Sequence, residues 1–436
     1  MSRILLLCSI VWACLFVVIP VQAQDISSKP EITIDELVQQ ALERYPQLAI
    51  ARQNTEAAKE RFKSLRSFPN PVLQLTPRLT GNREAADTEV LLSQPVDLFG
   101  KRRANAKVKE AEWHSAIAKS TFAQRSLIVQ VKQAAIELYA AQEAETLSNA
   151  QMEIAQKFHD AAQRRAALGD VPQVQAQRAA LELLRVQNEF ANSEATRLAQ
   201  LATVNKLIGQ DPSTQFRVIL PEVSGDQSQP TDLLKQRDQY LSQALKTRSD
   251  LLAASADLEA RRAQVKAIGK ERLPELQLQV RRGAFFGEES SYAVRAVITL
   301  PVFDFGSIKH ERRAAQAEAQ AQQAEVELLR QQIATQVEKA LLRLEQQWQN
   351  VDRYRSGIVP QTLDLLRKTQ VGFEQGASSY LEVLEAQRTF RQVQEEYLQA
   401  ISGTLNSETA LENAIGEAIP VGSLAPLPSQ VEVDTP

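Results

Sequence analysis

The feature that most constrains the fold of this 436-residue chain is an internal duplication. Residues 94–100 (QPVDLFG) lead into a long charged segment, and residues 300–306 (LPVFDFG) do the same about 206 positions later. Two more pairs of landmarks follow in the same order, Leu168-Gly169 with Gln375-Gly376 and residues 207–209 with 414–416. Landmarks that recur at a nearly constant spacing indicate two tandem copies of one structural unit, 32–210 and 230–416.

Each unit is predicted to contain one helix, two strands and two further helices. Segments rich in Ala, Gln, Glu, Arg and Leu and nearly free of Gly and Pro favour helix. The expected helices are 32–66, 100–168 and 172–208, then 230–270, 306–375 (with a kink at Pro360) and 380–415. Segment 100–168 alone would be roughly 100 Å long at ~1.5 Å per residue. The fold class is therefore mainly α with a small β part, made of long antiparallel helices.

Four short segments alternate between apolar and polar residues and are predicted to be strands: 72–80, 88–96, 275–283 and 291–300. This alternation fits the wall of a membrane barrel, with Arg281, Arg282 and Arg295 lining a water-filled lumen, and equally fits soluble hairpins covered by helices. Four strands cannot close a barrel, and an open strand edge is not tolerated in lipid. The membrane alternative therefore requires several copies of the chain, and three copies would supply twelve strands.

The two ends and the middle of the chain differ in composition from the repeats. Residues 1–23 have a basic start, an apolar run and small residues at 21–23, which is typical of an export signal. Both cysteines, Cys8 and Cys14, fall inside it and lack the preceding small residues of a lipid attachment site. The mature chain is thus expected to form no disulfide. Residues 211–229 are predicted to be a linker at the waist of the molecule, and 417–436 a Pro-rich tail.

Charge and side-chain chemistry exclude several classes of function. Without residue Arg3 of the signal, the chain has 49 basic and 53 acidic side chains, too balanced for a nucleic-acid partner. The three histidines, His114, His159 and His310, have no ligand partners at helical spacing, so we expect no metal site and no cofactor. No nucleophile–base arrangement stands out either, and we do not expect an enzyme.

The duplicated junction at 94–102 and the turn at 376–386 (GASSYLEVLEA) resemble the TolC family of outer-membrane efflux channels over essentially the whole mature chain. The resemblance implies a homotrimer with a twelve-stranded β-barrel in the outer-membrane lipid and an α-helical barrel in the periplasm. It also implies docking to a periplasmic adaptor and an inner-membrane pump of the RND type. Gly100-Lys101-Arg102 resembles the branch of the family that serves cobalt–zinc–cadmium efflux.

The same resemblance implies which residues form the gate and the docking tips. Glu382 and Glu385, six and nine positions after Gly376, are expected at the channel constriction, where six carboxylates from three chains would favour cations. An Asp–Arg gate pair of better-known members is absent, since Gln175 and Ser378 occupy those positions. The expected adaptor contacts are the hairpin tips Gly169, Asp170, Val171, Gly376, Ala377, Ser378 and Ser379.

The predicted function is a passive outer-membrane conduit for efflux, with heavy-metal cations as the expected cargo. Two alternatives stay open. One is an outer-membrane exporter for drugs or secreted proteins, and the other is a periplasmic coiled-coil scaffold without a channel.

Overall fold

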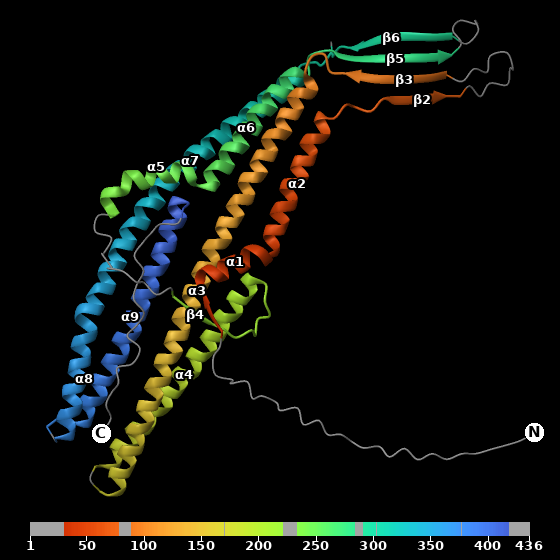
Figure 1. Ribbon diagram of the computed structural model, residues 1–436. Helices are drawn as coiled ribbons and strands as arrows, with labels where there is room; N and C mark the ends of the chain where they lie inside the picture. The colour runs from red at the N-terminus through yellow and green to blue at the C-terminus, as the bar shows by residue number, and fades with distance from the viewer. Residues whose placement is uncertain are drawn as a thin grey trace, which may run out of the picture.

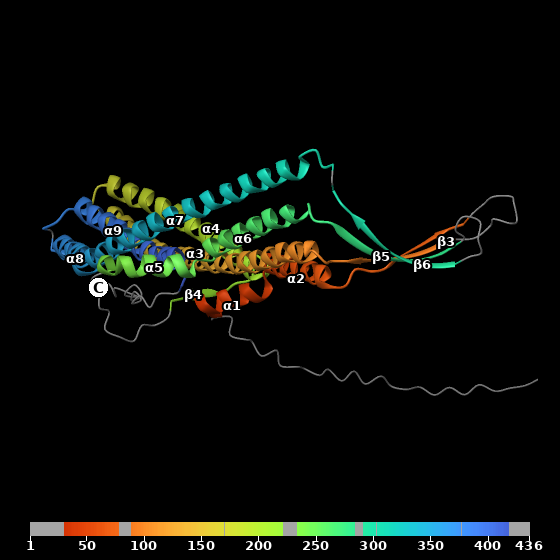
Figure 2. The ribbon, with the colours of Figure 1, turned by 90° about the horizontal axis from the view of Figure 1, so that it is seen from above.

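The computed structural model describes residues 30–77, 89–169, 171–220, 233–283, 291–301, 303–375 and 377–417. Long helices run side by side along most of the molecule, and a four-stranded sheet extends from one end of them (Figure 1). Viewed from above, the strands continue well beyond the helix ends (Figure 2). The expected fold class, mainly α with a small β part and a tandem repeat, is confirmed.

The first repeat and the start of the linker contain eight elements in the described residues. They are β1 (Glu31–Thr33), α1 (Ile34–Arg44), α2 (Pro46–Arg66), β2 (Val72–Thr76), β3 (Glu89–Val96), α3 (Lys101–Ala167), α4 (Gln173–Ile208) and β4 (Arg217–Ile219). The predicted strand 72–80 is observed to Thr76, and its last residues from 78 onward lie outside the described part of the chain.

The second repeat follows the same order. Its elements are η1 (Leu233–Gln236), α5 (Arg237–Thr247), α6 (Ser249–Lys270), β5 (Glu275–Gly283), β6 (Ser291–Thr299), α7 (Ser307–Arg353), a π turn η2 (Tyr354–Ile358), α8 (Val359–Glu374) and α9 (Tyr380–Ile415). Gly100 and Gly306, which precede α3 and α7, both have a left-handed backbone (φ 73° and 89°) that other residues adopt at a cost.

The expectation of one unbroken helix over 32–66, and of another over 230–270, was wrong. Tyr45 separates α1 from α2 in an extended conformation (φ −70°, ψ 121°), because the following Pro46 disfavours helical geometry in the residue before it. Arg248 makes the matching break between α5 and α6 (φ −65°, ψ 117°) without a proline. The linker also holds an unpredicted strand, since β4 pairs in parallel with β1.

The π turn η2 explains a small irregularity in the spacing of the repeats. Matched landmarks lie 206 positions apart at Gly100 and Gly306 but 207 apart at Gly169 and Gly376. Helix α3 has 67 residues, whereas α7, η2 and α8 have 47, 5 and 16, one residue more in total. A π turn accommodates one extra residue within a continuous helix. It lies directly before Pro360, where the sequence predicted a kink.

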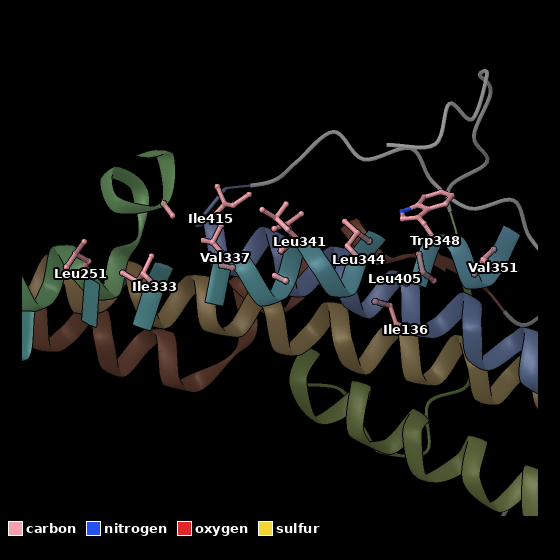
Figure 3. Packing of buried hydrophobic residues seen from close by; sticks show 14 of the residues in the cluster. Ile136, Leu251, Ile333, Val337, Leu341, Leu344, Trp348, Val351, Leu405 and Ile415 are labelled. Carbon is pink, nitrogen blue, oxygen red and sulfur yellow. The ribbon is translucent and has the colours of Figure 1, made fainter. Parts of the chain in front are cut away.

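The two larger clusters of the hydrophobic core lie in the middle of the helices, and each consists mainly of residues from one repeat. In the second repeat, Ile333, Val337, Leu344 and Trp348 form a stripe along α7 that packs with Leu405 and its neighbours of α9 (Figure 3). The first repeat buries residues from α1, α3, α4 and β4 in the same way, among them Leu37, Leu138, Leu201, Ile208 and Phe216. Burial of each large apolar side chain stabilises the fold by roughly 1.5–3 kcal/mol, so the waist anchors both long hairpins.

Candidate channel lining and gate

The sheet joins the two repeats. Its strand order is β2-β3-β5-β6, all antiparallel, and the central contact pairs β3 of the first repeat with β5 of the second. Strands β2 and β6 are the edges, and neither has a second partner among the described strands. Because side chains alternate between faces, the register divides the sheet into two surfaces of different chemistry.

One surface is apolar. Leu73, Leu92, Val280 and Val294 form a continuous row across the four strands, and each is between 42% and 78% exposed. On the same face, Leu278 pairs with Ala296 in the next row towards the helices, and Leu276 pairs with Ile298 in the row after that. An exposed apolar surface of this extent on an extended sheet is unfavourable in water and suits contact with hydrocarbon.

The opposite surface is polar and its charges are paired. Arg295 Nε donates a hydrogen bond to the amide oxygen Oε1 of Gln279 at 2.8 Å, and Arg281 Nε lies 2.6 Å from Glu89 Oε1. These groups suit a water-filled lumen. Arg282 was predicted to join them, but it lies on the apolar face near the loop end, with its guanidinium 5.7 Å from the ring centroid of Tyr292.

At the other end of the molecule, the chain reverses between α3 and α4 and again between α8 and α9. Gly169 ends the first hairpin arm with φ 83°, and the adjacent Leu168 is 78% exposed. Val171 is half-buried, while Ala377 and Ser379 are exposed. Two of the expected tip residues, Asp170 and Gly376, lie outside the described residues.

The second tip is held by hydrogen bonds around Gly372. Its carbonyl oxygen accepts bonds from the backbone N–H groups of Ala377 (2.7 Å) and Ser378 (3.0 Å). A methyl group on Gly372 would lie 2.5 Å from Ser378 Oγ, so a side chain at this position would displace the Ser378 hydroxyl.

The two expected gate residues lie on one exposed face at the start of α9. Glu382 also has a local structural role, because its carboxylate accepts a hydrogen bond from Ser379 N (2.7 Å) while Ser379 Oγ accepts one from Glu382 N (3.3 Å). This reciprocal capping box fixes the first turn of α9. Glu385 lies one turn further along and is exposed.

Sequence reasoning missed an ionic cluster between the two hairpins. Glu182 of α4 is only 9% exposed and accepts hydrogen bonds from Arg388 of α9, one of them from Nε at 3.3 Å. Arg391 Nη1 lies 3.7 Å from Glu182 Oε1 and 3.2 Å from Glu189 Oε2. The partners are 206 residues apart, so no local pattern could reveal them.

Burial by itself raises the pKa of Glu182, but the hydrogen bond from Arg388 and the charges of both arginines hold that pKa below its ordinary value. The carboxylate is therefore ionised at neutral pH. Nearer the tips, the guanidinium of Arg165 lies 5.4 Å from the ring centroid of Phe373, a second contact between the hairpins.

The described residues contain no group of three or more His, Cys, Asp or Glu side chains placed to hold a metal ion. His114 stacks on Trp113 with ring centroids 5.3 Å apart, and His159 Nδ1 lies 3.2 Å from Asp160 Oδ1. Across the same described ranges, no helix combines the length and apolar character needed to cross a membrane.

The model of the outer membrane efflux protein family matches this chain twice, over residues 37–210 and 240–417. The chain belongs to this family. It is accordingly an outer-membrane efflux channel whose helices extend into the periplasm, in a family of transport proteins. The two matched segments fall on the two repeats, one on each side of the linker.

Two curated members of the family show how far the sequence similarity extends. The cobalt-zinc-cadmium resistance protein CzcC of Cupriavidus metallidurans is 26% identical over 377 residues, which cover 85% of this chain and 86% of that protein. The pyoverdine export outer membrane protein OpmQ of Pseudomonas putida is 32% identical over 190 residues, or 40% of this chain and 38% of that protein.

Solved structures agree in fold. The outer-membrane channel OprN superposes with a TM-score of 0.74 at 19% identity, covering 88% of this chain and 89% of that one. The outer membrane protein VceC of Vibrio cholerae gives 0.74 at 19% identity (88% and 96%), and CusC gives 0.72 at 17% identity (88% and 92%). The predicted family, fold class and outer-membrane location are confirmed.

Proposed function

We propose that this chain is the outer-membrane component of a tripartite efflux system for heavy-metal cations. The observation that carries the proposal is the similarity to a cobalt-zinc-cadmium resistance protein across 85% of the chain and 86% of that relative. The matched part includes both repeats, so it involves the whole conduit and not one local motif.

In this proposal the working unit is a homotrimer. A sheet with an apolar outer face and two unpaired edge strands needs further strands before it can lie in lipid, because unpaired backbone groups are costly there. Three copies supply twelve strands and enclose a lumen lined by the polar face. The proposed divisions are a signal at 1–23, a waist segment at 211–229 and a tail at 417–436.

The partners follow from the position of the hairpin tips. The ends of α3 and α8 and the starts of α4 and α9 lie at the end of the molecule farthest from the sheet (Figure 1). A periplasmic adaptor would dock at the two turns between them. The channel itself is passive, and an inner-membrane pump of the RND type supplies the energy. Glu382 and Glu385 of three chains would place six carboxylates at the entrance and favour cations.

Deletion of the gene tests the cargo. We expect the deletion strain to become more sensitive to zinc, cobalt and cadmium, and a plasmid copy to restore tolerance, while sensitivity to organic dyes stays unchanged. Unchanged metal tolerance together with increased dye sensitivity would favour the drug-export alternative. The partial similarity to a pyoverdine export protein makes pyoverdine export the third activity to assay in this strain.

Conductance in planar bilayers tests the channel and its gate residues. The variant Glu382→Gln/Glu385→Gln removes both charges yet keeps the capping box, since glutamine serves that position as well. We expect a lower preference for cations over anions than in the wild type. Glu259→Gln, at an exposed position on α6, is the matched control. An unaltered preference in the double variant would exclude these two residues as the filter, and a protein that never conducts would favour the scaffold alternative.

A further inference from the structure

The two return helices α4 and α9 are equivalent in detail. Each has 36 residues, starts just after a hairpin tip and ends at a glycine with a left-handed backbone, Gly209 or Gly416. Each residue of α4 therefore corresponds to the residue 207 positions later in α9, as Gln173 corresponds to Tyr380. Equivalent positions allow a contact seen at one interface to be transferred to another.

In a closed ring, the two repeats of one chain alternate with the two repeats of the next. The contact from the first repeat to the second lies within a chain, and the equivalent contact from the second repeat reaches the first repeat of another copy. Such a head-to-tail interface uses two different surfaces and closes by rotation. The interface between copies should thus be formed by the equivalents of the residues that join α4 to α9 within the chain.

The transfer changes the chemistry of the interface. Within the chain, Arg388 and Arg391 of α9 face Glu182 and Glu189 of α4. The α4 equivalents of the two arginines are Leu181 and Leu184, and the α9 equivalents of the two glutamates are Thr389 and Glu396. The second interface therefore contains none of the three Glu–Arg pairings of the first.

Leu181 and Leu184 are strongly exposed in the single chain, as expected for leucines that pack against another copy. They are 67% and 62% exposed in the single chain and lie one turn apart on α4. Val174 extends the same face by two turns towards the tip and is 54% exposed. On the facing surface, Thr389 is exposed and its hydroxyl donates to Glu385 O of its own helix at 2.9 Å, so it presents a methyl group and no free charge.

We infer that Leu181 and Leu184 pack against the Thr389 and Glu396 face of α9 in a second copy of this chain, forming an interface without the ion pairs that join the hairpins of one chain. The inference rests on the proposed trimer and adds the residues that hold it together near the entrance. Its consequence is that the two hairpins of a chain stay joined through Glu182 while neighbouring copies can separate there.

Cysteine cross-linking of the full-length protein in detergent tests the interface. The only cysteines of the sequence are Cys8 and Cys14 in the expected signal. Any cross-link in the mature protein would therefore come from the introduced cysteines. We expect Leu181→Cys/Thr389→Cys, treated with a short bismaleimide, to give covalent dimers and trimers on a denaturing gel. A bismaleimide is chosen because the equivalent contact within one chain is made by the long side chains of Glu182 and Arg388. Backbones separated by such side chains are too far apart for a disulfide.

Two matched pairs serve as controls. Glu182→Cys/Arg388→Cys should cross-link within one chain and leave only monomer bands. Leu198→Cys/Thr389→Cys uses another exposed leucine of α4, 17 positions further along the helix, and should give no covalent oligomer. Covalent oligomers from Glu182→Cys/Arg388→Cys instead of Leu181→Cys/Thr389→Cys would overturn the inference.

The size of the unmodified protein separates this inference from the proposed function. A trimer by native mass spectrometry that gives no covalent oligomer from Leu181→Cys/Thr389→Cys would overturn the inferred interface and leave the channel proposal standing, with an adaptor as the remaining occupant of the leucine face. A monomer at all concentrations would overturn the proposed assembly itself.

Discussion

The two long arms of the molecule, α3 in the first repeat and α7 with α8 in the second, serve the same structural role with different local geometry. Helix α3 is regular over 67 residues, whereas its counterpart carries the π turn at Tyr354–Ile358. Tyr354 in this turn donates a hydrogen bond to Glu396 (3.1 Å) and stacks near Tyr397 at 6.2 Å. A duplicated unit can thus accept an extra residue if the helix takes it up locally and both ends keep their register.

Deletions at equivalent heights in the two arms test this explanation and should have the largest effects. Removing Gly357 from the π turn should restore regular α-helix and leave a folded protein, because the residues on both sides keep their contacts. Removing the buried Ser148 from α3 should rotate one half of that helix by about 100° and take its apolar stripe out of the core. Yield and circular dichroism of the purified variants would distinguish them. Equal loss of folding in both would contradict the assignment of the extra residue to the π turn.

The helix breaks at Tyr45 and Arg248 occupy matching places in the two repeats but have different causes. Proline sets the first break, whereas a buried guanidinium stabilises the second. Arg248 binds Asp250 (Nε–Oδ1 3.0 Å) and Gln336 (2.5 Å), and it also donates to Ala414 O at 3.4 Å. Its side chain is only about one tenth exposed.

Arg248→Ala should therefore destabilise the protein strongly. It leaves the carboxylate of Asp250 without its partner in a mostly buried place, which costs roughly 3–5 kcal/mol. Arg237→Ala, at the start of helix α5, is the control, since the Arg237–Glu338 pair is about half exposed and such pairs contribute about 1 kcal/mol or less. Guanidinium unfolding in detergent measures both, and similar midpoints for the two variants would argue against a structural role of Arg248.

The sequence predicted the parts of the fold that depend on long-range periodicity. The duplication, the two long hairpins and strand 275–283 could all be read from spacing and alternation. The two helix breaks were missed, the first because the general helical composition outweighed the local effect of Pro46. The second, at Arg248, could not be read from the sequence, because its stabilising contacts come from residues far along the chain.

The candidate site shows the same limit. Glu382 could be assigned to the first turn of a helix, because the sequence predicted that this helix begins at residue 380, as observed. The cluster of Glu182, Arg388 and Arg391 could not, because each residue looks like an ordinary charge on a helix face. Only the packing of α9 beside α4 brings these charges together and buries Glu182.

A third difference between the repeats is a buried carboxyl group. Leu201 of α4 is 1% exposed, and its equivalent in α9 is Glu408, whose Oε1 is buried without a hydrogen-bond partner in the described residues. Burial raises the pKa of Glu408 to about 8, the negative charge of Glu412 adds to this, and Lys132 of α3 opposes it. Lys132 itself lies 2.5 Å from Glu412.

Stability should therefore fall as the pH rises. The unfolded chain releases this proton near the ordinary pKa of 4.5, whereas the folded protein holds it up to about 8. The contribution is complete below pH 4.5 and is lost progressively towards pH 8, by roughly 2–3 kcal/mol after allowing for partial solvent access. Glu408→Leu, which copies the first repeat, should remove this dependence in melting curves taken between pH 5 and 8. A wild-type curve that is flat over this range would contradict the raised pKa.

The smallest expected effect concerns the two starts of the return helices. Helix α9 begins with the Ser379–Glu382 capping box, whereas α4 begins at Pro172 without a side-chain cap. Ser379→Ala should cost about 1 kcal/mol of stability, the usual contribution of such a cap. Thr33→Ala, which removes the corresponding box of α1, gives a matched reference far from the tips.

Conductance measurements on variants of this turn separate the charge of Glu382 from its role in the capping box. Ser379→Ala removes the hydroxyl that accepts a hydrogen bond from Glu382 N and leaves the charge of Glu382 unchanged, so cation preference should persist while the first turn of α9 loses one of its two capping bonds. Glu382→Gln does the opposite, because it keeps the cap and removes the charge. If both variants changed cation preference equally, the order of the turn would matter more than the charge, and the role of Glu382 would be structural.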